Sequence, residues 1–168
     1  MIAPHRLFDY FYGINKMKIL DVLKKETIVP NLEAIDKKCV LEELVAPVSH
    51  ISGIHSKDIM HVLMEREQLG STGIGEGIGF PHGKLKNLES LVLGLGISHK
   101  GVDFESIDDR PTYIFFLLMT PEKSTGLHLK VLARISSLLK NDLFKQQLLN
   151  AYDSDTIIEI IKEEDKEF

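Results

Sequence analysis

The sequence predicts an α/β fold, in which a single-domain sandwich is built from a mixed β-sheet flanked by α-helices. Strand-like and helix-like segments follow one another in mixed order, and several helical segments close the chain. An apolar run at residues 113–119, YIFFLLM, lies between Pro111 and Pro121. Its length and its bounding prolines are typical of a buried central strand, around which the helices would pack on both faces.

The composition is that of an ordered globular domain. The chain has 168 residues, of which 43% are hydrophobic and 27% charged, and no apolar run reaches the roughly 18 residues of a membrane helix. A formal net charge of −5 argues against a general nucleic-acid binder. Cys39 is the only cysteine, which excludes an intramolecular disulfide and fits a reducing compartment. With no signal peptide evident, we predict a cytoplasmic protein that is not integral to a membrane.

The first sixteen residues differ from the rest of the chain. They hold four of the twelve aromatic residues, and Met17 then opens a stretch, MKILDVL, that resembles a natural start. We interpret residues 1–16 as an N-terminal extension of non-native or upstream origin, and residues 17–168 as the domain. A short arm that packs on a surface is the alternative.

The first half of the domain begins with a short strand and a helix. Residues 28–32 are expected to form a strand that is interrupted at Pro30. Asp36 is a suitable N-cap for a helix with apolar residues at helical spacing, and Pro47 is expected to end it.

A second helix and a glycine-rich segment follow. Ser56 is expected to cap a helix over residues 57–68, which Gly70 ends. Residues 71–84, STGIGEGIGFPHGK, contain five glycines that alternate in part with apolar residues, so we expect part of this segment to be extended.

The second half supplies the main strands and three helices. Residues 91–98 and 111–121 are predicted strands. Ser124 or Thr125 is expected to cap a helix that runs to Asn141. Two short helices are then expected, over residues 142–151 and 155–164.

His82 is the strongest candidate for chemistry. It lies between Pro81 and Gly83, where proline restricts the backbone and glycine lets another chain approach closely. Free amides of such a loop can point at an anion. A neutral imidazole is a competent nucleophile, so this position suits a histidine that is phosphorylated and then meets a partner's active site. A turn histidine without a chemical role is the alternative that these residues alone leave open.

Four other side chains are candidates. His128 is placed in the first turn of its helix, where a neutral imidazole can donate an N–H to a phosphoryl oxygen, although a core histidine bonded to the backbone is the interpretation that this residue alone favours. Arg66 can bind phosphate through its fork of donors, or can be solvated. Lys84, likewise, can bind phosphate or be solvated. Thr72 either offers a hydroxyl near the loop or packs as a strand residue.

Several common sites are excluded. A phosphate-binding P-loop would need glycine where Ile78 stands, and a dinucleotide-binding fingerprint would need glycine at Phe80. The histidines at 50, 55 and 61 lack the cysteine or acidic frame of a zinc site. We therefore expect neither a cofactor nor a metal.

The glycine-rich segment resembles the active-site segment of the type-2 enzyme IIA domains, the mannitol/fructose class, of the bacterial phosphoenolpyruvate-dependent phosphotransferase system. Arg66-Glu67 resembles a pair that precedes this segment in the family, and residues 126–141 resemble its His-Leu helix, with His128 in the matching place. The resemblance covers about residues 17–164. It departs from the family at Gly79, where alanine is common, and at Phe80, where an aliphatic residue is common. The positions that match the glycine-rich pattern are Thr72, Gly75, Gly77, Ile78, Pro81 and His82.

The resemblance implies the type-2 enzyme IIA fold and a site for phosphoryl transfer. His82 matches the histidine that accepts a phosphoryl group on Nε2 from the histidine of HPr or of an HPr-like carrier. His128 and Arg66 match residues that stabilise the phosphoryl group. Such transfer between histidines needs no nucleotide or metal. The residues expected to support the site are Thr72, Gly75, Gly77, Pro81, Gly83 and Lys84.

The resemblance also favours one branch of the family. The Pro-His-Gly-Lys ending of the segment resembles the nitrogen-regulatory enzymes IIA, so we predict a regulator whose phosphorylation on His82 tunes its binding to target proteins. A fructose- or mannitol-specific IIA component that donates phosphate to a separate IIB is the alternative within the family. A protein-interaction module that is no longer phosphorylated is the alternative outside it.

Overall fold

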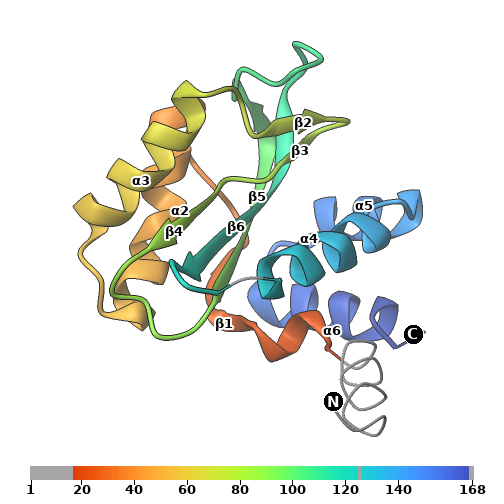
Figure 1. Ribbon diagram of the computed structural model, residues 1–168. Coiled ribbons are helices and arrows are strands. Elements are labelled where there is room, and N and C mark those ends of the chain that lie inside the picture. Colours follow the sequence, from red (N-terminus) through yellow and green to blue (C-terminus); the bar gives the residue numbers. More distant parts are fainter. Residues whose placement is uncertain (1–16, 125, 167–168) are drawn as a thin grey trace, which may run out of the picture.

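The computed structural model describes residues 17–124 and 126–166 and has three layers. One six-stranded sheet lies between two groups of helices (Figure 1). The first group consists of α2 (Lys37–Ser52) and α3 (Ser56–Gln68), and the second of α4 (Leu127–Leu138), α5 (Asp142–Leu149) and α6 (Ser154–Glu164). This arrangement confirms the predicted α/β sandwich. The extension proposed for residues 1–16 lies outside the described residues.

The sheet is mixed, and its central strand is the one that the apolar run predicted. Its order is β1-β5-β6-β3-β2, and β4 pairs with β6 beyond the end of β3. β1 runs parallel to β5, β5 is antiparallel to β6, and both β3 and β4 run parallel to β6. The strands are β1 (Leu23–Val29), β2 (Gly73–Gly75), β3 (Ile78–Gly79), β4 (His82–Leu85), β5 (Val92–Val102) and β6 (Thr112–Pro121).

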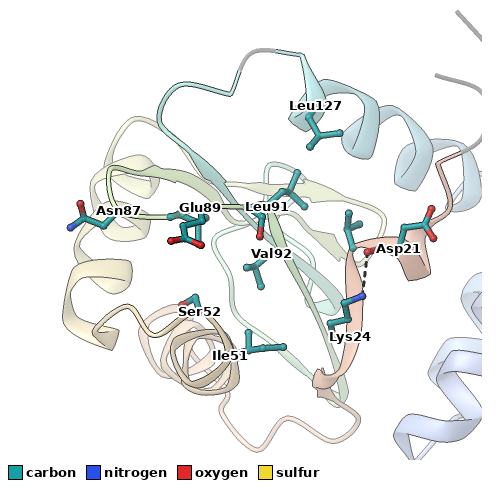
Figure 2. Close-up of a pocket in the computed structure, with 12 residues that line it drawn as sticks. Asp21, Lys24, Ile51, Ser52, Asn87, Glu89, Leu91, Val92 and Leu127 are labelled. Carbon is teal, nitrogen blue, oxygen red and sulfur yellow. Dashed lines mark hydrogen bonds between the residues drawn. The ribbon is translucent and has the colours of Figure 1, made fainter. Parts of the chain in front are cut away.

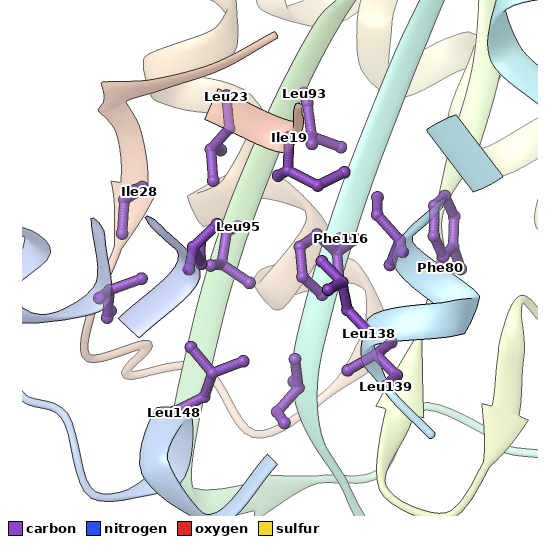
Figure 3. Packing of buried hydrophobic residues seen from close by; sticks show 14 of the residues in the cluster. Ile19, Leu23, Ile28, Phe80, Leu93, Leu95, Phe116, Leu138, Leu139 and Leu148 are labelled. Carbon is purple, nitrogen blue, oxygen red and sulfur yellow. The ribbon is translucent and has the colours of Figure 1, made fainter. Parts of the chain in front are cut away.

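Alternate residues of β6 build the two halves of the core. Phe116 and its neighbours two residues away pack with residues of α4, α5 and α6. Figure 3 shows Phe116 on the same side of the sheet as Leu138, Leu139 and Leu148. Phe115 and the next alternate residues face α2 and α3. Because both faces are buried, β6 is apolar at almost every position, which is why its sequence reads as a continuous hydrophobic run.

The first strand differs from the prediction. β1 spans Leu23–Val29 rather than residues 28–32, and it ends before Pro30. Its pairing with β5 shifts register between Leu23 and Ile28, and the charged residues between them are exposed. This irregularity breaks the alternation by which a half-buried strand is recognised in a sequence.

α2 begins as predicted and ends later. The carboxylate of Asp36 accepts the backbone N–H of Cys39 at 2.9 Å, which confirms it as the N-cap. The predicted end near Pro47 is wrong, because the helix continues to Ser52 and is closed by Gly53 in the left-handed conformation (φ 72°). Burial of Val48, one residue beyond the proline, offsets the backbone hydrogen bond that Pro47 cannot make.

Other helix ends differ by a few residues. His55, and not Ser56, caps α3, since its Nδ1 accepts the N–H of Lys57 at 3.2 Å. α4 begins after Gly126 without a side-chain cap, so Ser124 does not have the capping role expected of it.

The predicted cap at Thr125 lies outside the described residues. α4 ends at Leu138 because Asn141 caps α5, accepting the N–H groups of Leu143 and Phe144. Asp153 caps α6 in the same way, one residue earlier than the predicted start implied.

Candidate functional site

The glycine-rich segment forms a hairpin and then follows β6. β2 turns at Glu76-Gly77, where φ is 56° and 78°, and the chain returns as β3. Between β3 and β4, Pro81 has no N–H to donate, but its carbonyl accepts the N–H of Leu118 at 3.0 Å. The N–H of Phe80 turns the other way, to the carbonyl of Thr72 at 2.8 Å. Residues 80 and 81, which interrupt the pairing with β6 between β3 and β4, are therefore each fixed by a backbone hydrogen bond.

His82 is the first residue after the interruption, and its ring is held by the backbone. Its Nδ1 lies 2.9 Å from the carbonyl oxygen of Phe80. A carbonyl only accepts hydrogen bonds, so Nδ1 carries a proton, and in the neutral ring Nε2 keeps its lone pair. The ring of Phe80 meets the imidazole edge-on, with centroids 6.4 Å apart and planes at 65°. The nitrogen left without a proton in the neutral ring, Nε2, is the one on which the family resemblance places the phosphoryl group.

Because residue 83 is glycine, α3 can pack directly against β4. A methyl group at this position would lie 2.5 Å from Val62 Cγ1, which is closer than carbon atoms pack. Gly83 is also paired with Met119 of β6. The strand that carries His82 is therefore held between a helix and the central strand.

A cavity of about 310 Å³ brings the two candidate histidines together. His82 and Lys84 reach it from β4, and His128 reaches it from the first turn of α4. The Nδ1 of His128 is buried, and no hydrogen-bond partner for it exists in the described part of the chain. Orphan polar atoms of this kind are rare in cores and mark places where a ligand or water completes the site. The cavity is lined by His82, Gly83, Lys84, Leu118, Thr120, His128, Leu129 and Leu132.

Arg66 and Thr72 do not line this cavity. Arg66 lies in the last turn of α3, and its Nη1 donates to the carbonyl of Gly70 at 2.9 Å. Thr72 is buried, and its hydroxyl donates to the carboxylate of Glu67 rather than reaching the imidazole. Arg66 thus binds the residue just before the glycine-rich segment, and Thr72 is held by Glu67 at the start of the segment.

The sequence pattern does not indicate that Phe80 contacts the ring of His82 or that Glu67 binds Thr72. Phe80 stands out in the sequence as a departure from the family and from a dinucleotide-binding fingerprint, and Glu67 as the partner of Arg66 in a motif. A signal for Glu67 existed, since Ile59, Leu63 and Glu67 are spaced by four and share the buried side of α3. A carboxylate on the apolar side of a helix requires internal partners.

A larger hollow of about 610 Å³ lies elsewhere, near the beginning of β1 and the end of α2 (Figure 2). Its wall includes Asp21, Lys24, Glu89 and Leu127, and the lining contains no histidine or cysteine. Lys24 Nζ is directed to the carbonyl of Asp21 at 3.4 Å. The smaller cavity holds the histidine pair and is the candidate site.

Two other kinds of feature were searched for within residues 17–124 and 126–166. No helix there is long and apolar enough to cross a membrane. In the same part of the chain, no three His, Cys, Asp or Glu side chains are grouped as metal ligands would be.

Comparison with known proteins identifies the relatives of this chain. Residues 21–164 match the family model described as the EIIA 2 component of the phosphoenolpyruvate-dependent sugar phosphotransferase system. A nitrogen regulatory protein of Bradyrhizobium diazoefficiens is 37% identical over 86% of this chain and 95% of its own length. The fructose-specific EIIABC component of Bacillus subtilis is 36% identical over 89% of this chain, which spans only 24% of that longer protein.

Solved structures agree with the sequence relatives. The nitrogen regulatory protein IIA-Ntr of Neisseria meningitidis superposes with a TM-score of 0.78 at 28% identity, covering 84% of this chain and 97% of the other. The mannitol enzyme IIA of Escherichia coli, at 18% identity and a TM-score of 0.70, covers 82% of this chain and 97% of its own and shares the fold. The chain therefore belongs to the EIIA type-2 family, a phosphotransferase component of the phosphoenolpyruvate-dependent sugar phosphotransferase system.

Proposed function

We propose that this protein is a cytoplasmic phosphocarrier that accepts a phosphoryl group on Nε2 of His82 from the phosphohistidine of HPr or an HPr-like carrier. The observation that carries the proposal is the hydrogen bond of His82 Nδ1 with the carbonyl of Phe80. It leaves Nε2 unprotonated on a ring that borders the cavity shared with His128.

The transfer exchanges one N–P bond for another. The lone pair of His82 Nε2 attacks phosphorus, the N–P bond to the carrier's histidine breaks, and the electron pair of that bond returns to the carrier's imidazole. The carrier's ring leaves neutral, while the ring of His82 keeps its Nδ1 proton and gains positive charge. The carbonyl of Phe80 faces that proton and stabilises the charge that develops.

The surroundings of His82 supply the rest of what phosphoryl transfer requires, which is positioning and stabilisation of charge. His128 lies in the first turn of α4, where unpaired backbone N–H groups and the helix dipole favour the phosphoryl anion. Lys84, two residues after His82 on the same side of β4, adds a positive charge at the cavity. The contact with the phosphoryl group that the resemblance implies for Arg66 would require its guanidinium to leave the carbonyl of Gly70.

We further propose a regulatory role, in which the phosphorylation state of His82 controls binding to target proteins. The full-length relation to nitrogen regulatory proteins supports this role. A sugar-specific role, with phosphate passed to a separate IIB, is a second candidate because a fructose-specific EIIA component of Haloferax volcanii is also matched over 98% of its length.

Intact-mass spectrometry tests the phosphocarrier role. The protein is incubated with phosphoenolpyruvate, enzyme I and HPr, and a gain of one acid-labile phosphoryl group is expected. His82→Ala should abolish the gain, whereas His99→Ala, which alters a histidine far from the cavity, should retain it. Full labelling of His82→Ala would refute the assignment. Transfer of the label to an added fructose IIB would favour the sugar-specific role over the regulatory one.

A further inference from the structure

Glu67 is a buried carboxylate at the end of α3 that accepts three hydrogen bonds from two residues, Lys37 and Thr72. Its side chain is 4% exposed. Lys37 Nζ donates to Oε2 at 2.8 Å, the backbone N–H of Thr72 donates to the same oxygen at 3.2 Å, and the Thr72 hydroxyl donates to Oε1. The carboxylate thus fixes both the backbone and the side chain of Thr72.

A continuous path of hydrogen bonds leads from this carboxylate to His82. The carbonyl of Thr72 accepts the N–H of Phe80 at 2.8 Å, and the carbonyl of Phe80 bonds the Nδ1 of His82 at 2.9 Å. Each member of the path is a backbone group or a buried side chain. We therefore expect a shift at Glu67 to displace Thr72 and, through it, the carbonyl of Phe80 that faces Nδ1 of His82.

Lys37 also connects Glu67 to β3, the strand just before Phe80, through contacts in the core. Its Nζ lies 5.0 Å from the centre of the Phe104 ring, and that ring packs edge-on against Phe115 at 5.1 Å. Phe115 in turn fills the space beside Gly79, where a methyl group would lie 2.8 Å from its Cδ1.

Lys37 also binds Glu105 at 2.8 Å. Burial lowers the pKa of Lys37, but the hydrogen bonds to Glu105 and Glu67 more than offset this effect, so the net pKa lies above the ordinary lysine value.

We propose that Glu67, with Lys37 as its counter-ion, is a positioning residue that holds His82 in the Nδ1–H tautomer. Buried ion pairs add little net stability compared with apolar residues of similar volume, so stability alone does not account for a carboxylate at this point of the core. Its three hydrogen bonds do account for the orientation of Thr72 and, through it, of Phe80. The kinetic part of this proposal rests on the proposed function, whereas the tautomer does not.

The test is the tautomer of His82, read from the ring ¹⁵N chemical shifts in the unphosphorylated protein. Wild type should show the Nδ1–H form, and Glu67→Ala should raise the other tautomer severalfold. Glu43→Ala is the matched control, because Glu43 also accepts backbone N–H groups, those of Glu33 and Ala34, at a place remote from His82. We expect the control to lose stability and to keep the wild-type tautomer.

A second readout is the rate of phosphorylation. Glu67→Ala should slow it by about tenfold, since a misplaced reacting group commonly costs one to two orders of magnitude, and Glu43→Ala should keep the wild-type rate. Glu67→Gln keeps the shape and one acceptor, and should fall between the two; it replaces Glu67→Ala if that variant does not fold. An unchanged tautomer in a folded Glu67 variant would overturn the proposal. If wild type is not phosphorylated at all, the proposed function fails while the tautomer result still decides the role of Glu67.

Discussion

Replacing Gly83 by alanine tests how closely α3 supports the strand that carries His82. The added methyl group would lie 2.5 Å from Val62 Cγ1 and 3.3 Å from Met119 Cε, whereas contacting carbons are normally about 3.5–4.0 Å apart. α3 or β4 must therefore move by about 1 Å, and β4 is held by its pairing with β6. Overpacking of this kind costs about 1–3 kcal/mol, so we expect the free energy of unfolding to fall by about 2 kcal/mol.

Urea denaturation of four proteins measures this effect: wild type, Gly83→Ala, Val62→Ala and the double variant. The alanine at position 62 removes the clashing Cγ1, so the double variant should be more stable than the sum of the single effects by about 1–2 kcal/mol. Gly94→Ala is the control, since its methyl group would meet its nearest neighbours at 3.4 Å, an ordinary contact. Additivity of the two single effects within about 0.5 kcal/mol would refute the argument that Val62 is the obstacle.

Three further predictions concern the site and the helix caps. His128→Ala should slow phosphorylation of His82 by about 100-fold, as for loss of one preorganised donor, and an unchanged rate would leave His128 a packing role. Gly79→Ala should lower the free energy of unfolding by about 1–3 kcal/mol, because its methyl group would lie 2.8 Å from Phe115 Cδ1; Phe115→Leu should restore part of the loss in urea titrations. The backbone N–H groups of Cys39 and Thr156 lower the pKa of the capping carboxylates Asp36 and Asp153. The stabilisation that these two ionised carboxylates provide is complete above the unfolded pKa of about 3.9 and is lost as pH falls through the lower folded pKa. The melting temperature should therefore drop below about pH 4. This drop should be less steep in the Asp36→Asn and Asp153→Asn variants.

The sequence predicts those parts of the fold whose signals are local. The apolar run bounded by prolines identifies β6, and Asp36 identifies the start of α2, because both depend on residues adjacent in the chain. The end of α2 and the extent of β1 depend on tertiary packing. Pro47 is tolerated since Val48 is buried, and the register shift of β1 arises in its pairing with β5, which lies far away in the sequence.

In the candidate site, too, the sequence predicts what depends on adjacent residues and does not predict what depends on tertiary packing. His82 is recognised by its glycine and proline neighbours, and the pairing of the glycine-rich segment with β6 brings it to the cavity that contains His128. Arg66 is adjacent to the motif in sequence, yet its guanidinium binds the carbonyl of Gly70 and does not line the cavity. The direction in which a long side chain points depends on its surroundings, and the sequence pattern alone does not specify those.

Gly79, the last residue of β3, and Phe80, which follows it, face opposite sides of the sheet. A methyl group at Gly79 would collide with Phe115, whose ring fills the face covered by α2 and α3. Phe80 points the other way, stacks on Phe116 at 6.2 Å and meets the edge of the His82 ring. Directly before His82, the chain thus leaves room for Phe115 on one side of the sheet and places an aromatic ring on the other. Because Phe80 is only 5% exposed, a carrier protein has little of it to touch. In the proposed transfer, its aromatic ring would therefore act by orienting the imidazole rather than by contacting the carrier.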